Sequence, residues 1–154
     1  MTQPKLVSRC GIYCDACYVY RAFKDGGEFL DSVSKELGVP KSQIRCGGCL
    51  GPEEELWQNC RKCRVRACLK EKGFDFCYEC PEFEKGCDGY ESLFSSCLQR
   101  GEDTKEALKH FRIGKTEEWL KEQDKKWRCT KCKGKLSWYE KTCHHCGGSI
   151  SPTK

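Results

Sequence analysis

Residues 129–146 read CTKCKGKLSWYEKTCHHC and contain two Cys-x2-Cys pairs that ten residues separate. Two cysteines at this spacing present two thiolates to one ion, and two such pairs complete the tetrahedron that zinc prefers. Gly134 and the pair Gly147-Gly148 supply tight turns, which let backbone amides reach the sulfur atoms. The stretch therefore predicts a structural zinc ribbon with four thiolate ligands, Cys129, Cys132, Cys143 and Cys146.

The residues around these cysteines lead to two further predictions, one about strands and one about histidines. Residues 136–139, Leu-Ser-Trp-Tyr, have strand character, so we expect short strands in the ribbon. His144 and His145 lie inside the second pair, where one of them could replace a cysteine as ligand. Because four thiolates already complete a tetrahedron, we expect both histidines to face solvent instead.

The chain is poor in the residues that build a hydrophobic core. Val, Ile, Leu and Phe together make 27 of 154 residues, below the roughly one fifth expected of a self-sufficient domain. The formal net charge is only +5, and sixteen cysteines supply the missing stabilisation, as bound metal or as disulfides. The N-terminal residues lead into no apolar run, so we expect no secretory signal, no membrane span and a cytoplasmic protein. Thiols stay reduced in that compartment, which favours metal.

Twelve of the cysteines lie in residues 1–97, and their grouping is open. The pairs at 46/49 and 60/63 repeat the spacing of the ribbon and predict a second set, Cys46, Cys49, Cys60 and Cys63. A third set could be Cys68, Cys77, Cys80 and Cys87. The remainder would then be Cys10, Cys14 and Cys17, with Cys97 as the fourth ligand. Interleaved ligation, as in cross-braced zinc domains, fits these spacings equally well.

The first three cysteines have a second interpretation. Cys10, Cys14 and Cys17 follow a C-x3-C-x2-C pattern, which resembles the cluster loop of radical S-adenosylmethionine enzymes. Those enzymes use a large barrel, and this chain is too short for one. A non-catalytic iron–sulfur cluster at these residues remains an alternative to zinc, because thiolate sets suit both.

The distribution of cysteines divides the chain into three parts. We expect a cysteine-rich metal-binding domain over residues 1–97, a helical linker over 98–127 and the zinc ribbon over 128–154. Apolar periodicity predicts helices over residues 19–24, 28–37, 60–72, 89–100, 105–111 and 117–127. Thr104 and Thr116 are the expected N-caps of the last two. The predicted fold class is a small, metal-stabilised α+β protein with short helices.

Three runs, CGIYCDACYVYRAFKDG, IRCGGC and CRKCRVRACLKEKGFDFCYECPEFEKGC, resemble the cysteine-rich family known as domain of unknown function 3795. The resemblance covers about residues 8–95, and WLKEQDKKWRCTKC resembles the zinc-ribbon extension of some members. It implies a small bacterial or archaeal cytosolic protein that binds zinc, without an agreed activity. The motif positions that it implies are Cys10, Cys14, Cys17, Cys46, Cys49, Cys63, Cys68, Cys77, Cys80 and Cys87.

Three function classes follow. The first is a zinc-binding protein that acts as a binding or adaptor module, with a protein partner. The second is an iron–sulfur protein with a redox or transferase role. The third is a nucleic-acid binder that uses the basic residues 125–141, where Trp127, Trp138 and Tyr139 alternate with lysines and could stack on bases. No paired carboxylates, phosphate loop or Ser-His-Asp arrangement is recognisable, so we do not expect an enzyme.

Overall fold

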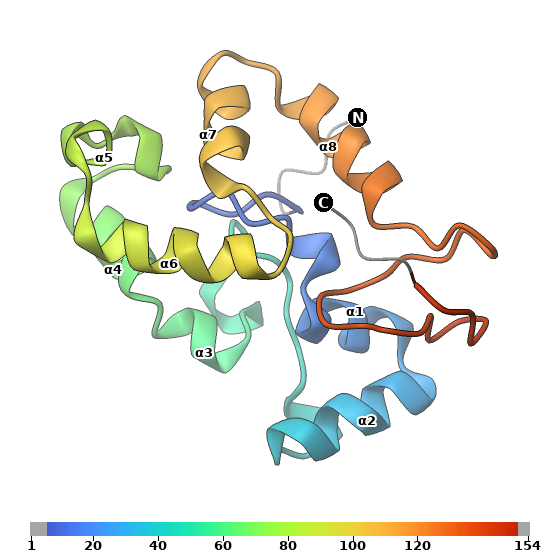
Figure 1. Ribbon diagram of the computed structural model, residues 1–154. Coiled ribbons are helices and arrows are strands. Elements are labelled where there is room, and N and C mark those ends of the chain that lie inside the picture. The colour runs from blue at the N-terminus through green and yellow to red at the C-terminus, as the bar shows by residue number, and fades with distance from the viewer. Residues whose placement is uncertain (1–5, 151–154) are drawn as a thin grey trace.

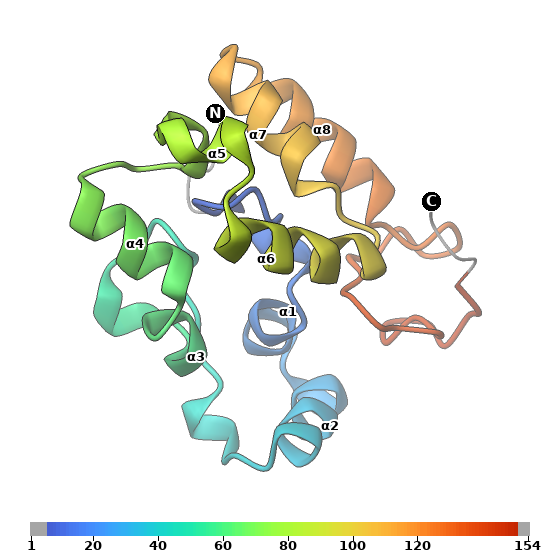
Figure 2. The same cartoon turned by 60° about the vertical axis from the view of Figure 1, so that its left-hand side comes forward.

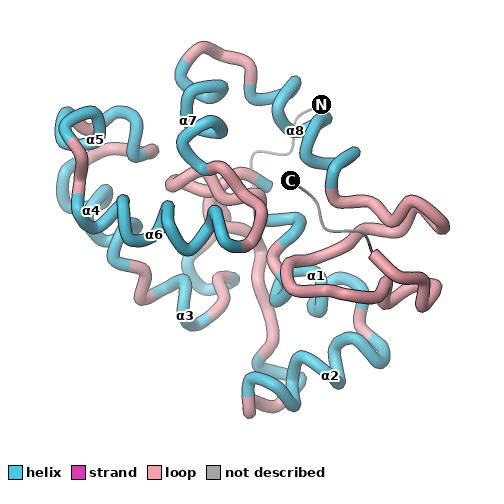
Figure 3. The backbone as a smooth tube through the Cα atoms, viewed as in Figure 1, coloured by secondary structure: helices cyan, strands magenta, loops and turns pink. Residues whose placement is uncertain are grey.

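The computed structural model describes residues 6–150 and consists of short helices joined by long loops (Figures 1 and 3). The α-helices are α1 (Tyr18–Asp25), α2 (Gly27–Leu37), α3 (Gln58–Arg61), α4 (Arg64–Lys72), α5 (Pro81–Lys85), α6 (Asp88–Gln99), α7 (Thr104–Arg112) and α8 (Thr116–Lys126). Short 3-10 helices are η2 (Cys14–Ala16), η3 (Lys41–Gln43), η4 (Glu53–Glu55) and η5 (Cys77–Glu79). Within residues 6–150, the helices are all too short or too polar to cross a membrane.

Glycine ends two of the predicted helices at the expected places. Gly38 follows α2 with φ +68°, and Gly73 follows α4 with φ +79°. Glycine adopts this left-handed conformation without steric cost, and its N–H can then bond to a carbonyl of the last helical turn. The Gly38 N–H donates to the Ser34 carbonyl in this way.

The single helix predicted over residues 60–72 is wrong. The chain forms α3 and α4 instead, and Lys62 and Cys63 separate them. Cys63 has extended backbone angles, φ −63° and ψ 125°, and is the N-cap of α4. An N-cap residue leaves the helical conformation, so the run of helix-forming residues is interrupted there.

The predicted N-caps of the last two helices are also wrong by one residue. Asp103, not Thr104, caps α7, and its carboxylate accepts the Glu106 N–H at 3.0 Å. The Thr104 hydroxyl is buried and bonds to the Tyr90 hydroxyl at 2.8 Å. Helix α8 begins at Thr116 after Lys115, with no side-chain cap.

The α+β prediction is not supported, because residues 6–150 contain no strand (Figure 3). The C-terminal segment has only two isolated bridges, Arg128 with Lys135 and Thr142 with Ser149. Residues 136–139, where we expected strand, bond elsewhere: the Trp138 N–H donates to the Ala16 carbonyl at 3.0 Å. Tyr139 then has φ +68°, which ends the extended backbone. This segment therefore pairs only briefly within the C-terminal part, where the Leu136 N–H donates to the Trp127 carbonyl at 2.8 Å, and then docks on the N-terminal part of the chain.

Helices α7 and α8 share one hydrophobic core with the N-terminal loop (Figure 2). Tyr13 and Phe111 both meet Trp119 edge-to-face, at ring-centroid distances of 5.8 and 5.0 Å. A second, smaller core lies between α1, α2 and the following loop and includes Val19, Ile44 and Trp57. These cores are small, and cysteines contribute to both.

Candidate metal centres

The four C-terminal cysteines meet at one point. The Sγ atoms of Cys129, Cys132, Cys143 and Cys146 all lie within 4.8 Å of one another. Cys129 and Cys146 are 3.8 Å apart, and Cys132 and Cys143 are 3.7 Å apart. A zinc ion with bonds of about 2.3 Å to four sulfurs separates those sulfurs by about 3.8 Å. The spacing of this donor set therefore fits a single tetrahedral ion.

Backbone amides point at these sulfurs. The Gly134 N–H donates to Cys132 Sγ at 3.4 Å, and the His145 N–H donates to Cys143 Sγ at 3.3 Å. The amides of Lys131 and Cys132 lower the pKa of the Cys129 thiol to about 6. Such amides stabilise the thiolate form, which is the form that binds metal.

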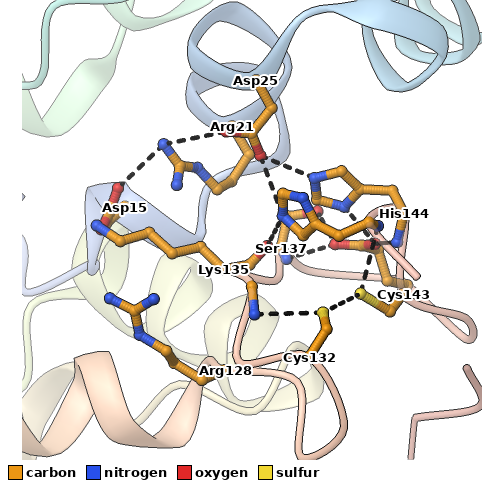
Figure 4. A network of polar contacts seen from close by, with 12 residues as sticks. Asp15, Arg21, Asp25, Arg128, Cys132, Lys135, Ser137, Cys143 and His144 are labelled. Carbon is orange, nitrogen blue, oxygen red and sulfur yellow. Dashed lines mark hydrogen bonds and ion pairs between the residues drawn. The ribbon is translucent and has the colours of Figure 1, made fainter. Parts of the chain in front are cut away.

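Two buried contacts hold this centre against the N-terminal part of the chain. Lys135 forms an ion pair with Asp15, which is 3% exposed and also pairs with Arg21 at 3.5 Å (Figure 4). The Trp138 ring is buried, and the Arg100 guanidinium lies 4.1 Å from its centroid. The C-terminal centre is therefore part of the tertiary structure rather than a free appendage.

His144 does not face solvent as we expected. Its side chain is only 11% exposed, and its two ring nitrogens lie 2.8 Å from Asp25 and 2.7 Å from Glu140 (Figure 4). Its ring also stacks on Phe29 at a centroid distance of 4.0 Å. These carboxylates hold the pKa of His144 above its usual value despite the opposing effect of burial. His144 is buried because Asp25, at the end of α1, brings a carboxylate acceptor to the loop between Cys143 and Cys146.

In residues 1–97, cysteines that are distant in the sequence lie near one another, unlike the sets that we predicted from spacing along the chain. Burial raises the pKa of Cys14 and of Cys17, and the neighbouring thiol of Cys46 adds to both shifts. Burial raises the pKa of Cys60 to about 12, and the thiols of Cys17, Cys46 and Cys49 add to this. This arrangement is interleaved along the chain, because the first and second Cys-x2-Cys pairs meet.

Amides also point at the sulfurs of this interleaved group. Cys17 is the N-cap of α1, and the N–H groups of Val19 and Tyr20 lower its pKa against the larger effect of burial. The Cys49 N–H acts in the same way on Cys14. Burial raises the pKa of Cys10, and the thiols of Cys49 and Cys97 add to this shift. Because Cys49 also acts on Cys14, Cys10 borders the interleaved group and neighbours Cys97 as well.

The remaining cysteines line one cavity of about 650 Å³ between α4, η5, α5 and α6. They are Cys63, Cys68, Cys77, Cys80 and Cys87. Cys63 lines this cavity and its thiol also adds to the raised pKa of Cys49 and Cys60, so it lies between this group and the set that sequence spacing predicted for it. Among all described cysteines outside the C-terminal four, no three sulfur atoms lie within 4.8 Å of one another.

The basic stretch 125–141 is partly engaged within the protein. Trp127 and Trp138, which we expected to be available for base stacking, are 8% and 7% exposed. Three of its cations, Lys126, Arg128 and Lys135, bond to Gly101, Asp124 and Asp15. The exposed cations are Lys125, Lys131, Lys133 and Lys141. Of the three aromatic side chains, only Tyr139, which is 67% exposed, remains accessible to a base.

Glu102 is a site residue that sequence reasoning missed. It is 3% exposed, accepts the Tyr13 N–H at 2.7 Å and accepts the Trp138 indole N–H. Burial raises the pKa of this carboxyl to about 7. A lone glutamate after Arg100-Gly101 carries no pattern that marks it as buried, so only the fold reveals it.

The raised pKa of Glu102 makes stability depend on pH. The folded state binds this proton more tightly than the unfolded chain, whose glutamates titrate near pH 4.3. The stability that the Glu102 proton gives to the folded state is therefore fully present below about pH 4, and it is lost as the pH rises through about 7. We expect the Trp138 indole N–H resonance to titrate with a midpoint near 7 in NMR spectra, with Trp138→Phe giving the assignment.

Glu102→Gln is the control for this titration, because the amide keeps the shape but has no proton to lose. In that variant the indole resonance should stay constant over the same pH range. An indole shift that persists in Glu102→Gln would assign the titration to another group.

Sixteen free cysteines, four of them arranged around an ion-sized space, define a cysteine-rich protein with a candidate metal centre. A family model described as "Protein of unknown function (DUF3795)" matches residues 6–92, and the chain belongs to this family. The matched region ends before α7, α8 and the C-terminal cysteines. No curated protein and no solved structure matches the chain.

Proposed function

We propose that the protein is a zinc-binding protein and that Cys129, Cys132, Cys143 and Cys146 hold a structural zinc ion as a ribbon. The sulfur–sulfur distances of 3.7 and 3.8 Å are the observation that carries this proposal, because they match a zinc tetrahedron. The amides that donate to Cys132 and Cys143 add support, since such bonds accompany metal-bound thiolates.

A second zinc site is proposed at the interleaved group, with ligands from Cys14, Cys17, Cys46, Cys49 and Cys60. Two features support it: these thiols interact with one another, and backbone amides donate to Cys14 and Cys17. Burial raises the pKa of each of these two thiols, and a bound cation would reverse this by stabilising the thiolate.

The biochemical role that we propose is that of a cytoplasmic binding or adaptor module. A zinc ion with four thiolates has no open position for a substrate, so such a site stabilises a surface rather than performing a reaction. The exposed lysines 125, 131, 133 and 141 would contribute to that surface. The division into residues 1–97, 98–127 and 128–154 remains part of this proposal.

Native mass spectrometry of anaerobically prepared protein tests the zinc assignment. We expect at least one zinc per chain, and chelation should unfold residues 127–150 as seen by hydrogen exchange. Cobalt(II) substituted at the C-terminal site should show the absorption of tetrahedral coordination by four sulfurs. A folded, metal-free protein, or disulfides among these four cysteines, would contradict the proposal.

A further inference from the structure

Helices α4 and α6 lie side by side (Figure 2). The cavity between them brings together five cysteines from separate segments. Cys63, Cys80 and Cys87 are the N-caps of α4, α5 and α6, while Cys68 lies within α4 and Cys77 within η5. Cys77 and Cys80 are buried at 8% exposure each. Helix packing, not local sequence, therefore gathers these thiols around one space.

The size of this space suits a metal group larger than a single ion. The cavity measures about 650 Å³, and no three of its sulfurs lie within 4.8 Å of one another. In the same structure, the C-terminal sulfurs are only 3.7 and 3.8 Å apart. The sulfurs of this cavity, like those of the interleaved group, are therefore spaced more widely than those of the C-terminal centre.

The thiols nevertheless face the same space. All five cysteines line this one cavity, together with the apolar side chains of Leu69, Phe83 and Leu93. A metal group bound by several of these thiols would shield the thiolates from one another.

The charge of the cavity wall favours an anionic group. Arg64, Lys72 and Arg100 line the cavity, against one acidic residue, Asp88. Lys72 Nζ lies 3.5 Å from Cys80 Sγ. A four-iron cluster with four thiolate ligands is an anion, so these cations would stabilise it.

We propose that Cys68, Cys77, Cys80 and Cys87 bind a [4Fe–4S] cluster in this cavity. Each thiol gives up its proton to solvent, and each sulfur bonds to one iron of a cluster assembled from two ferrous ions, two ferric ions and four sulfides, so that no further oxidant is needed. Because the four irons occupy the corners of a cube, their thiolates lie farther apart than those around one zinc ion. Cys63 is the fifth thiol and is not a ligand. This assignment is separate from the zinc sites of the proposed function.

Anaerobic reconstitution of the full chain with ferrous iron, ferric iron and sulfide tests this assignment. We expect a brown protein with four irons and four sulfides per chain, and an electron paramagnetic resonance signal after reduction. Cys77→Ser with Cys80→Ser should lose this chromophore, while the matched variant Cys63→Ser should keep it. Cys132→Ser should keep the chromophore and lose one zinc ion per chain, which separates failure of this proposal from failure of the zinc proposal.

Alkylation of the reconstituted wild-type protein gives a second measurement that does not depend on variant folding. Mass spectrometry should find the four ligand cysteines protected and Cys63 labelled. The proposal would be overturned by wild-type protein that takes up only zinc at this cavity. It would equally be overturned by a cluster that protects Cys14, Cys17, Cys46 and Cys49 instead.

Discussion

Cys143→Ser is expected to remove one zinc ion per chain and to unfold residues 127–150. Cys143 is 2% exposed and belongs to the small cluster of Cys129, Leu136 and Ile150, which is too small to fold without the ion. A structural zinc site supplies about 10–16 kcal/mol of apparent binding free energy in finger peptides. Native mass spectrometry measures the loss of zinc, and hydrogen exchange locates the unfolded segment.

Lys133→Ala is the matched control for this experiment. Lys133 directly follows the ligand Cys132 and is exposed. Because it is not a ligand itself, the variant should keep the wild-type zinc content. Residues 6–92 should remain protected in both variants, because the ligands of the C-terminal site all come from residues 129–146. Loss of every zinc ion from Cys143→Ser would show that the sites are not independent.

Trp138→Ala is expected to lower the free energy of unfolding by about 3–5 kcal/mol, the range found when a large buried aromatic side chain is removed. The Trp138 ring is 7% exposed, lies under the Arg100 guanidinium and donates to the buried Glu102. The variant would leave a cavity, and one carboxylate oxygen of Glu102 would lose its donor while the other still accepts the Tyr13 N–H. Denaturant unfolding followed by circular dichroism measures the change.

Tyr139→Ala provides the comparison, because the two aromatic residues are adjacent. Tyr139 is 67% exposed, so its removal should cost less than about 1 kcal/mol. Zinc should remain bound in both variants, since neither residue supplies a sulfur. Equal losses for the two substitutions would mean that the burial of Trp138 does not hold the C-terminal centre in place.

Local structure was the part of the fold that the sequence predicted best. The helix over residues 28–37 and its end at Gly38 were correct because apolar periodicity and a left-handed glycine are local signals. The helix over 60–72 was wrong, since Cys63 leaves the helical conformation to reach a cavity that distant segments complete. The strand at residues 136–139 was wrong, because Trp138 bonds to Ala16, which is remote in sequence.

The candidate sites also differ in how much of them the local sequence could predict. The four C-terminal cysteines lie within eighteen residues, so their spacing alone indicated that their sulfurs would meet. The other twelve span residues 10–97, and spacing left several groupings open. His144 was misplaced because its partner Asp25 is 119 positions away along the chain.

The sequence by itself predicted that sulfur ligands would help to organise this protein, and it determined which four cysteines meet in the C-terminal centre. Only the tertiary structure decided that Cys14 and Cys17 lie beside Cys46, and that a separate cavity collects Cys63 with Cys77. The physical reason is that a Cys-x2-Cys pair fixes two sulfurs within one turn of the chain. Which pairs share a site depends on tertiary packing, namely that of α4 against α6 and that of η2 near the loop at Cys46.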